Sequence, residues 1–228
     1  MTSVYLVRHG QASLGAENYD QLSALGREQA ALLGQHWHAL KVRFEQAWCG
    51  SLVRQVDTAH AILSTYHNAG AHAPALRRDP RFDEYDFDPI LKTYAFTQGI
   101  NAIPMQDPRK FYEFLRSALS AWVSGALSSP AVPNWAAFAS NCASAFSELA
   151  AAANRDSRIL LVTSGGVISA VLCHVLRTPP EKFVDFNLAI RNSAVTRIEI
   201  HGSGMYLHSF NGLPHIEQLN RSHLVTLA

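Results

Sequence analysis

Short apolar runs alternate with longer amphipathic stretches along most of this chain. Residues 4–7 are four successive apolar or aromatic residues, and Arg158–Thr163 carries a similar run late in the sequence. Uninterrupted runs of this kind, rich in β-branched side chains, are typical of strands buried on both faces. Their alternation with helical periods predicts an α/β fold, a three-layer sandwich with a mostly parallel central sheet and helices on both faces.

The remaining elements follow from the same periodicities and from capping residues. Ser23 precedes apolar residues at helical spacing and is a predicted N-cap, and Asp107 followed by Pro108 predicts another helix start. We expect a helical insertion at about residues 90–133. The other expected strands are residues 47–49, 75–76, 194–200 and 205–210. The other expected helices begin near residues 51, 133 and 167. We also expect a loop over residues 77–89 and a polar tail after residue 212 that wraps the surface.

Composition narrows the class of protein. The 228 residues, 48% hydrophobic and 16% charged with a formal net charge of +1, suit a single domain over residues 1–228. This balance gives no reason to expect a nucleic-acid or membrane partner. No signal peptide or transmembrane run is visible, so we expect a cytoplasmic protein. The three cysteines match no metal or disulfide pattern, and we expect them to be reduced thiols: Cys49, Cys142 and Cys173. A homo-oligomer is compatible with the sequence but not indicated by it.

Three of the predicted strand ends carry residues suited to binding an anion. Arg8-His9-Gly10 ends the first strand, the turn from Cys49 to Arg54 follows the second, and Ser164-Gly165-Gly166 follows the late strand. Open α/β sheets bind ligands at the carboxyl ends of their strands, and helix N-termini offer N–H groups to phosphate. A histidine presented there beside arginines is suited to attack an anionic group.

Four segments, in this order, resemble the signature of the histidine phosphatase superfamily, which includes the phosphoglycerate mutases. They are Leu-Val-Arg-His-Gly at residues 6–10, Leu-Ser-Ala-Leu-Gly-Arg-Glu-Gln-Ala at 22–30, Ser-Leu-Val-Arg-Gln-Val-Asp-Thr-Ala at 51–59, and Arg-Phe-Asp-Glu at 81–84. Residues 164–166 lie where the late strand of that family ends. The resemblance covers roughly residues 3–177.

The resemblance implies a role for each matching residue. His9 would be the nucleophile that forms a phosphohistidine, and Arg8 and Arg54 would bind the phosphoryl oxygens, a task that suits the permanently charged guanidinium fork. Glu84 would protonate the leaving oxygen and then activate water. The nearby acids Asp83, Asp86 and Asp88 are alternatives to Glu84 as the proton donor.

The implied function is a metal-independent phosphomonoester hydrolase that needs no cofactor and acts on a small phosphorylated substrate. The residues do not identify the natural substrate. Two alternatives stay open: a non-catalytic phosphate-binding or regulatory protein, and a phosphoglycerate-type mutase. The mutase is the less favoured of the two, because the loop after His9 does not resemble the longer mutase pattern.

Ser164 departs from the family pattern, which places a second histidine before the Gly-Gly pair. We expect Ser164 and Gly165 to bind phosphate through neutral donors. A neutral hydrogen bond is weaker than a charged one by about 1 to 2 kcal/mol. This deficit would slow the chemistry roughly tenfold to thirtyfold, so we expect reduced activity and a gain in turnover from Ser164→His. His174, on the helix after this turn, is a second candidate to replace the missing donor.

The polar loop after His9 offers further donors. Gln11, Ser13 and Asn18 follow the predicted nucleophile closely, in a stretch without apolar periodicity. Such a loop lies over the end of the strand it follows. The resemblance implies that one of the three donates an extra hydrogen bond to the phosphate, and the sequence does not separate them.

Overall fold

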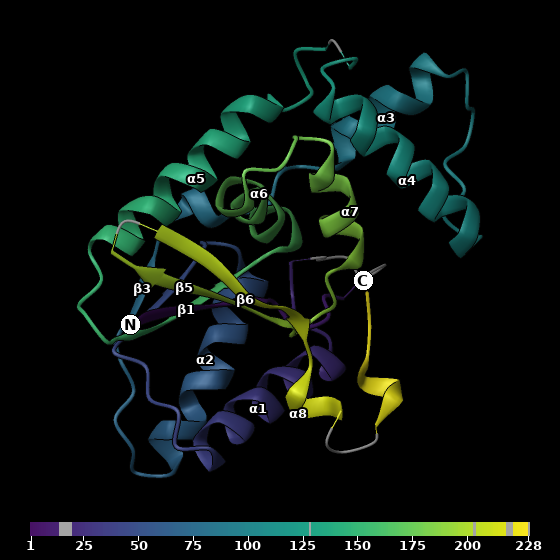
Figure 1. The fold of residues 1–228 in the computed structure, drawn as a ribbon. Coiled ribbons are helices and arrows are strands. Elements are labelled where there is room, and N and C mark those ends of the chain that lie inside the picture. Colours follow the sequence, from purple (N-terminus) through teal and green to yellow (C-terminus); the bar gives the residue numbers. More distant parts are fainter. Residues whose placement is uncertain (14–19, 128, 203, 218–220, 228) are drawn as a thin grey trace.

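A mixed sheet forms the centre of the structure, a computed structural model that describes residues 1–13, 20–127, 129–202, 204–217 and 221–227. Its strands within these residues are β1 (Thr2–Arg8), β2 (Gln46–Cys49), β3 (Leu76–Arg78), β4 (Arg158–Thr163), β5 (Val195–His201) and β6 (Gly204–Gly212). Their order across the sheet is β3-β2-β4-β1-β5-β6 (Figure 1). β3, β2, β4 and β1 pair in parallel, whereas β5 pairs antiparallel with β1 and β6 antiparallel with β5.

Helices cover both faces of the sheet, as the sequence predicts. Alternate side chains of β1 enter two different cores, because successive residues of a strand point to opposite faces. Val4 and Leu6 join one buried cluster, and Tyr5 and Val7 join the other. The α/β three-layer sandwich is therefore confirmed, with a sheet that is mostly parallel.

One face is covered by two neighbouring helices, α1 (Ala24–Ala39) and α2 (Val53–Asn68), which run in the same direction (Figure 1). The predicted cap of α1 is confirmed, since Ser23 Oγ accepts a hydrogen bond from Gly26 N at 3.0 Å. Trp37 of α1 packs edge-to-face on Tyr5 of β1, with ring centroids 5.7 Å apart. Burial of such aromatic pairs stabilises this layer well beyond helix propensity alone.

The other face is covered by α5 (Trp135–Ala151), α6 (Gly165–Leu176) and α7 (Lys182–Ala189). α6 begins two residues earlier than the sequence predicts, and the sequence analysis missed α7 entirely. α7 is short, and the ring of its buried Phe183 packs at a tilt against Trp135, with a centroid distance of 4.5 Å. Packing against α5 rather than local periodicity therefore stabilises this helix.

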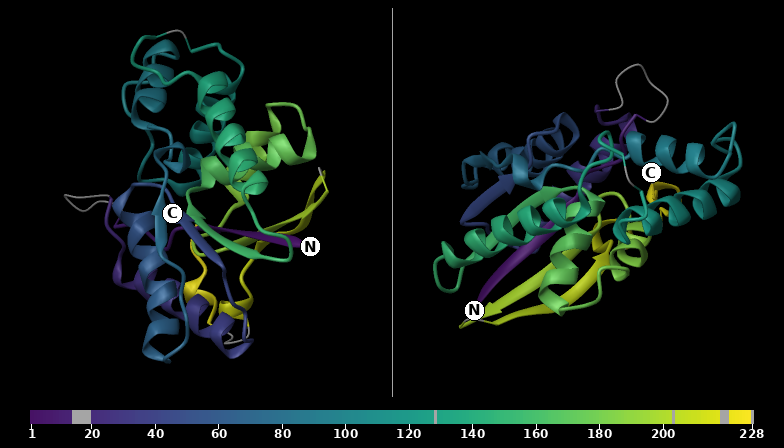
Figure 2. Two further views of the ribbon diagram at one scale, coloured as in Figure 1. Left: turned by 90° about the vertical axis from the view of Figure 1, so that its left-hand side faces the viewer. Right: turned by 90° about the horizontal axis from the view of Figure 1, so that it is seen from above.

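The region expected as a helical insertion contains α3 (Asp88–Thr97) and α4 (Pro108–Val123), which extend beyond the end of the sheet (Figures 1 and 2). Tyr94 and Phe114 join the two helices, with ring centroids 5.3 Å apart. The predicted start of α4 is confirmed, because Asp107 accepts hydrogen bonds from the first-turn amides. The preceding region is less irregular than expected, since β3 reaches Arg78 and a 3₁₀ turn, η1, spans Pro80–Phe82.

The C-terminal segment packs more tightly than a surface wrap. It contains α8 (Pro214–Glu217) and the 3₁₀ turn η2 (Ser222–Leu224). Leu213 and Leu224 are fully buried beside Leu25 and Leu32 of α1. The polar composition of this tail concealed a few apolar residues that fill a third small core. None of the helices in the described part of the chain is long and apolar enough to span a bilayer.

Candidate active site

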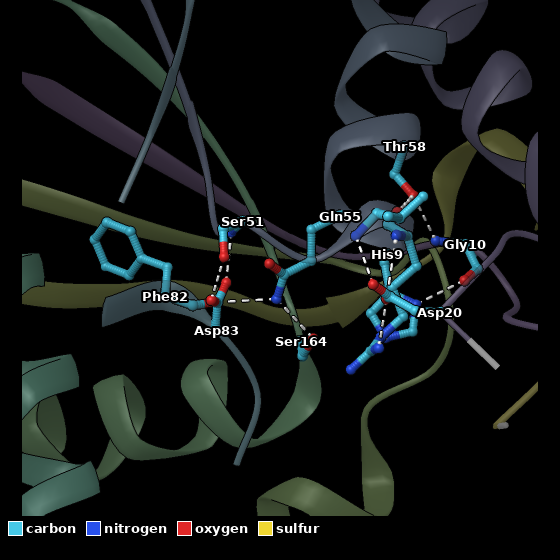
Figure 3. Close-up of polar contacts among 11 residues, drawn as sticks. His9, Gly10, Asp20, Ser51, Gln55, Thr58, Phe82, Asp83 and Ser164 are labelled. Carbon is cyan, nitrogen blue, oxygen red and sulfur yellow. Dashed lines mark hydrogen bonds and ion pairs between the residues drawn. The ribbon is translucent and has the colours of Figure 1, made fainter. Parts of the chain in front are cut away.

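His9 follows the last residue of β1 and is buried between the ends of β1 and β4. Its backbone N–H donates to Thr163 O at 2.8 Å, so His9 lies beside the end of β4. The ring Nδ1 lies 2.7 Å from Gly10 O. Arg54 Nε donates to Nε2 at 3.2 Å (Figure 3). A carbonyl only accepts, so both contacts require the tautomer with hydrogen on Nδ1 and the lone pair on Nε2.

The surroundings of His9 favour its uncharged form. Burial lowers the pKa of His9 well below its usual value, and the positive charges of Arg8 and Arg54 lower it further. The ring is therefore neutral at neutral pH. A neutral imidazole with a directed Nε2 lone pair has the properties of a nucleophile.

Arg54 lies in the first turn of α2 and is held by a carboxylate that the sequence analysis missed. Asp20 Oδ1 accepts from Arg54 Nη1 at 2.7 Å. Asp20 also accepts from the backbone N–H of Val53 at 2.8 Å, so it caps α2 from a distant segment. Leu52 occupies the N-cap position and offers no side-chain cap. No local spacing pointed to this residue, because its partners lie more than thirty residues away.

Arg8 reaches across the end of the sheet toward α6. Its Nη1 donates to Ile190 O and to Leu227 O, each at 2.6 Å. A Cβ built on Gly165 would lie 3.7 Å from Arg8 Nε, so the guanidinium stem packs against the N-terminus of α6. Gly165 is thus placed beside the predicted phosphate-binding arginine.

Glu84 accepts a hydrogen bond from the backbone N–H of Gly166, in the first turn of α6, at 3.1 Å. Its other oxygen, Oε1, is buried and has no hydrogen-bond partner among the described residues. Burial raises the pKa of Glu84, although the Gly166 N–H and the charges of Arg54 and Arg8 oppose this. A carboxyl group with a raised pKa retains its proton more readily, as a general acid requires.

The three competing acids make other contacts. Asp83 accepts from the backbone N and the Oγ of Ser51, each at 2.5 Å. Asp86 accepts from the N–H of Asp88, and Asp88 forms an exposed ion pair with Lys92. Of the four acids, Glu84 is the one that contacts the N-terminus of α6.

Ser164 is fully buried directly after β4, in the position next to His9. Its Oγ accepts from Gln55 Nε2 at 2.8 Å, and the same nitrogen donates to Phe82 O at 3.0 Å (Figure 3). No local pattern in the sequence indicated a role for Gln55. His174 does not replace the missing histidine, because it is exposed at the far end of α6 and contacts Ser147.

The loop residues predicted as extra donors have different surroundings. Gln11 Oε1 accepts from Ser23 Oγ at 2.8 Å, which ties this side chain to the start of α1. Ser13 donates its backbone N–H to Gln21 O at 2.8 Å. Asn18 lies outside the described residues. The backbone N–H of Gly10 donates to Thr58 Oγ1 at 3.0 Å. This contact, which the sequence did not indicate, joins the loop to α2.

The three strand ends therefore form one site. His9 Nε2 faces the guanidinium of Arg54, Arg8 lies beside Gly165, and the acid Glu84 borders the same helix N-terminus. Two guanidinium groups and the amides of helix N-termini favour a phosphoryl group. Among the described residues, no group of three or more His, Cys, Asp or Glu side chains is arranged to hold a metal ion.

Curated relatives of this chain are phosphatases. Serine/threonine-protein phosphatase Pgam5, mitochondrial, of Caenorhabditis briggsae is 26% identical over 206 residues, which cover 89% of this chain and 59% of the relative. The Rattus norvegicus protein of that name is 24% identical over 203 residues, covering 88% of this chain and 59% of the relative. The chain thus spans about 59% of the length of these relatives.

Solved structures share the fold. A mutant phosphoserine phosphatase from Entamoeba histolytica in complex with phosphoserine aligns with a TM-score of 0.65 and 20% identity, covering 95% of this chain and 100% of that one. A phosphoglycerate mutase from Bacillus anthracis aligns with a TM-score of 0.67 and 18% identity, covering 95% and 96%. Residues 4–212 match the Histidine phosphatase superfamily (branch 1). The match covers most of the chain, which therefore belongs to the histidine phosphatase superfamily, branch 1.

Proposed function

We propose that this protein hydrolyses phosphomonoesters through a covalent phosphohistidine on His9. The observation that carries the proposal is the state of the ring, with Nδ1 directed at Gly10 O and Nε2 facing Arg54. This arrangement leaves a neutral nucleophile beside a permanent cation. A phosphoryl group bound between Arg54 and Arg8 would place its phosphorus within reach of Nε2.

In the first step, Nε2 attacks phosphorus and the bond from phosphorus to the ester oxygen breaks. Arg54 Nε gives up its contact with Nε2 and donates to a phosphoryl oxygen instead. Glu84 transfers its proton to the departing oxygen, so the alcohol leaves uncharged. The Nδ1–H bond to Gly10 O holds the ring as it gains positive charge.

In the second step, the Glu84 carboxylate takes a proton from water. The water oxygen attacks phosphorus, the phosphorus–nitrogen bond breaks, and inorganic phosphate leaves. His9 recovers its Nε2 lone pair and Glu84 its proton. Every proton in the cycle is moved by a protein group, so we expect a chelator such as EDTA to leave the rate unchanged.

The relatives support the class of substrate. One solved structure of this fold is a phosphatase in complex with phosphoserine, and the curated relatives are named serine/threonine-protein phosphatases. We therefore propose a small phosphorylated molecule or side chain as the substrate. Ser164 leaves one fewer charged donor than the family pattern has, so we expect turnover below that of an enzyme with two histidines.

Trapping the covalent intermediate tests the proposal. Brief mixing with a radiolabelled phosphomonoester and an alkaline quench should leave label on the protein that is stable to alkali and labile to acid. His9→Ala should abolish both the label and phosphate release. His174→Ala is a matched control, because His174 is exposed at the far end of α6, and it should label like the wild type.

Other outcomes would point to the alternatives. Binding of phosphate with neither label nor release would contradict the proposal and favour a non-catalytic phosphate-binding protein, the reading that the neutral Ser164 supports. Interconversion of phosphoglycerate isomers without net phosphate release would identify a mutase.

A further inference from the structure

Gln55 is a fully buried glutamine that joins three segments of the site. It follows Arg54 on α2, and its Nε2 donates to Ser164 Oγ at 2.8 Å and to Phe82 O at 3.0 Å. An amide nitrogen carries two hydrogens, and these two contacts use both. The amide group is therefore oriented without ambiguity, because exchanging its nitrogen and oxygen would place an acceptor against the Phe82 carbonyl.

The stability of the fold does not account for this amide. Its oxygen, Oε1, is buried without a hydrogen-bond partner in the part of the chain that the structure describes. A buried polar atom left unpaired is destabilising and calls for an explanation. The Phe82 carbonyl does not depend on Gln55, because Thr163 Oγ1 also donates to it, at 2.6 Å.

The contact with Ser164 has a directional consequence. Since Ser164 Oγ accepts a hydrogen from Gln55, its own hydrogen must point elsewhere. No second partner for this oxygen is found among the described residues. Ser164 follows β4 as His9 follows β1, and the last residues of these paired strands, Thr163 and Arg8, are in register. Ser164 therefore follows the strand next to that of His9, at the edge of the sheet where we place the phosphoryl group, and its side chain lies against Gln55 (Figure 3).

We infer that Gln55 is a positioning residue, which holds the Ser164 hydroxyl with its hydrogen directed at the transferring phosphoryl group. The inference rests on the proposed function of this site. Together the two side chains form a neutral donor pair where the family pattern has a second histidine. Neither an amide nor an aliphatic hydroxyl titrates near neutral pH, so this donor keeps its hydrogen across the whole working range.

A double-mutant cycle with orthovanadate as the probe tests the inference. Gln55→Met and Ser164→Ala should each weaken orthovanadate binding roughly threefold to tenfold, the range for one neutral hydrogen bond. The double variant should bind no more weakly than Ser164→Ala alone, because Gln55 acts through Ser164. The kcat for p-nitrophenyl phosphate should show the same coupling. Gln55→Met conserves volume and should unfold at nearly the wild-type temperature.

Thr163→Val separates the two contacts of Gln55, since it removes the other donor to Phe82 O. The effect of Gln55→Met on orthovanadate binding should be of the same size in the Thr163→Val background. If Gln55→Met does not fold, Gln55→Asn, which withdraws the amide by one methylene, takes its place in the cycle.

Additive losses from Gln55→Met and Ser164→Ala would overturn the inference, as would wild-type affinity in Gln55→Met. So would an effect that grows markedly in the Thr163→Val background, where Phe82 O has lost its other donor, because the role of Gln55 would then lie at the Phe82 carbonyl. A wild-type protein that does not bind orthovanadate overturns the inference and the proposed function together. Coupled binding losses without any phosphohistidine would contradict the proposed function alone, because the binding cycle needs no turnover.

Discussion

At the scale of the residue, burial moves the two proposed proton-handling groups toward their uncharged forms. It lowers the pKa of His9, with Arg8 and Arg54 acting in the same direction, and it raises the pKa of Glu84. A nucleophile needs a free lone pair and a general acid needs a proton, so both shifts favour the proposed chemistry. Ser164 and Gln55, which do not titrate, complete the site as neutral donors.

Gln55 changes what Ser164→His should do. The resemblance alone predicts a gain in turnover, but Ser164 is fully buried with the Gln55 amide 2.8 Å from its hydroxyl. An imidazole at residue 164 needs that space, and overpacking a core costs about 1 to 3 kcal/mol. We therefore expect Ser164→His alone to lower both stability and turnover. Combined with Gln55→Ala it should raise turnover above the wild type, roughly tenfold, by restoring a charged donor.

Steady-state kinetics with p-nitrophenyl phosphate and thermal unfolding of both variants check this expectation. Equal gains in the single and the double variant would show that Gln55 leaves room for an imidazole.

At the scale of the element, two helix N-termini meet the strand ends. α2 presents Arg54 and is capped by Asp20, and α6 brings its backbone close enough to Glu84 for the Gly166 N–H to bind it. Such close approach requires glycine. A Cβ on Gly166 would collide with Glu84 Oε1 and the Tyr85 ring.

Gly166→Ala should therefore displace the Glu84 carboxyl. A shift of about 1 Å in a catalytic group lowers activity by up to a hundredfold, so we expect a loss of roughly tenfold to a hundredfold in kcat. Gly70→Ala is the matched control. Gly70 has open space around it but a φ of +67°, so this substitution should cost about 1 kcal/mol of stability and leave kcat unchanged. Wild-type kcat in Gly166→Ala would contradict the proposed place of Glu84 in the reaction.

At the scale of the whole molecule, residues of the C-terminal segment contact the end of β1 that carries the site. Ser193 donates its backbone N–H to Arg8 O at 3.0 Å, and its Oγ lies 2.9 Å from Nε2 of the buried His215 in α8. Burial, and to a lesser degree His36, lowers the pKa of His215 to about 3. This segment is therefore packed around a neutral histidine.

The titration of His215 predicts how stability depends on pH. Its pKa is about 3 in the folded state, against a usual value of 6.5, so the unfolded chain binds the extra proton between these values. Stability is unaffected above about pH 6.5 and falls as the pH drops toward 3, by about 3 kcal/mol between pH 7 and pH 4. Urea unfolding across this range should show a shallower fall for His215→Gln than for the wild type. Parallel curves would contradict a neutral buried His215.

Features that depend on neighbours in the chain were predictable from the sequence. The caps of α1 and α4 by Ser23 and Asp107 are local, since a side chain binds the amides two or three residues on. The buried strands show as apolar runs for the same reason. The sequence also predicts which strand ends meet, because parallel strands place their carboxyl ends at one edge of the sheet. For this reason Arg8-His9-Gly10 and Ser164 were expected together.

Only the tertiary structure decided the contacts between segments that lie far apart in the chain. No periodicity or spacing in the sequence indicates the contacts of Asp20 with Arg54, of Gln55 with Ser164, or of Glu84 with Gly166. The same holds for α7 and the tail, whose few apolar residues are buried by packing rather than by pattern. The sequence by itself determined the layers, the strand ends and the residue types brought to them. Orientation of those residues required the fold, because a hydrogen bond depends on distance and angle, and neither is encoded locally.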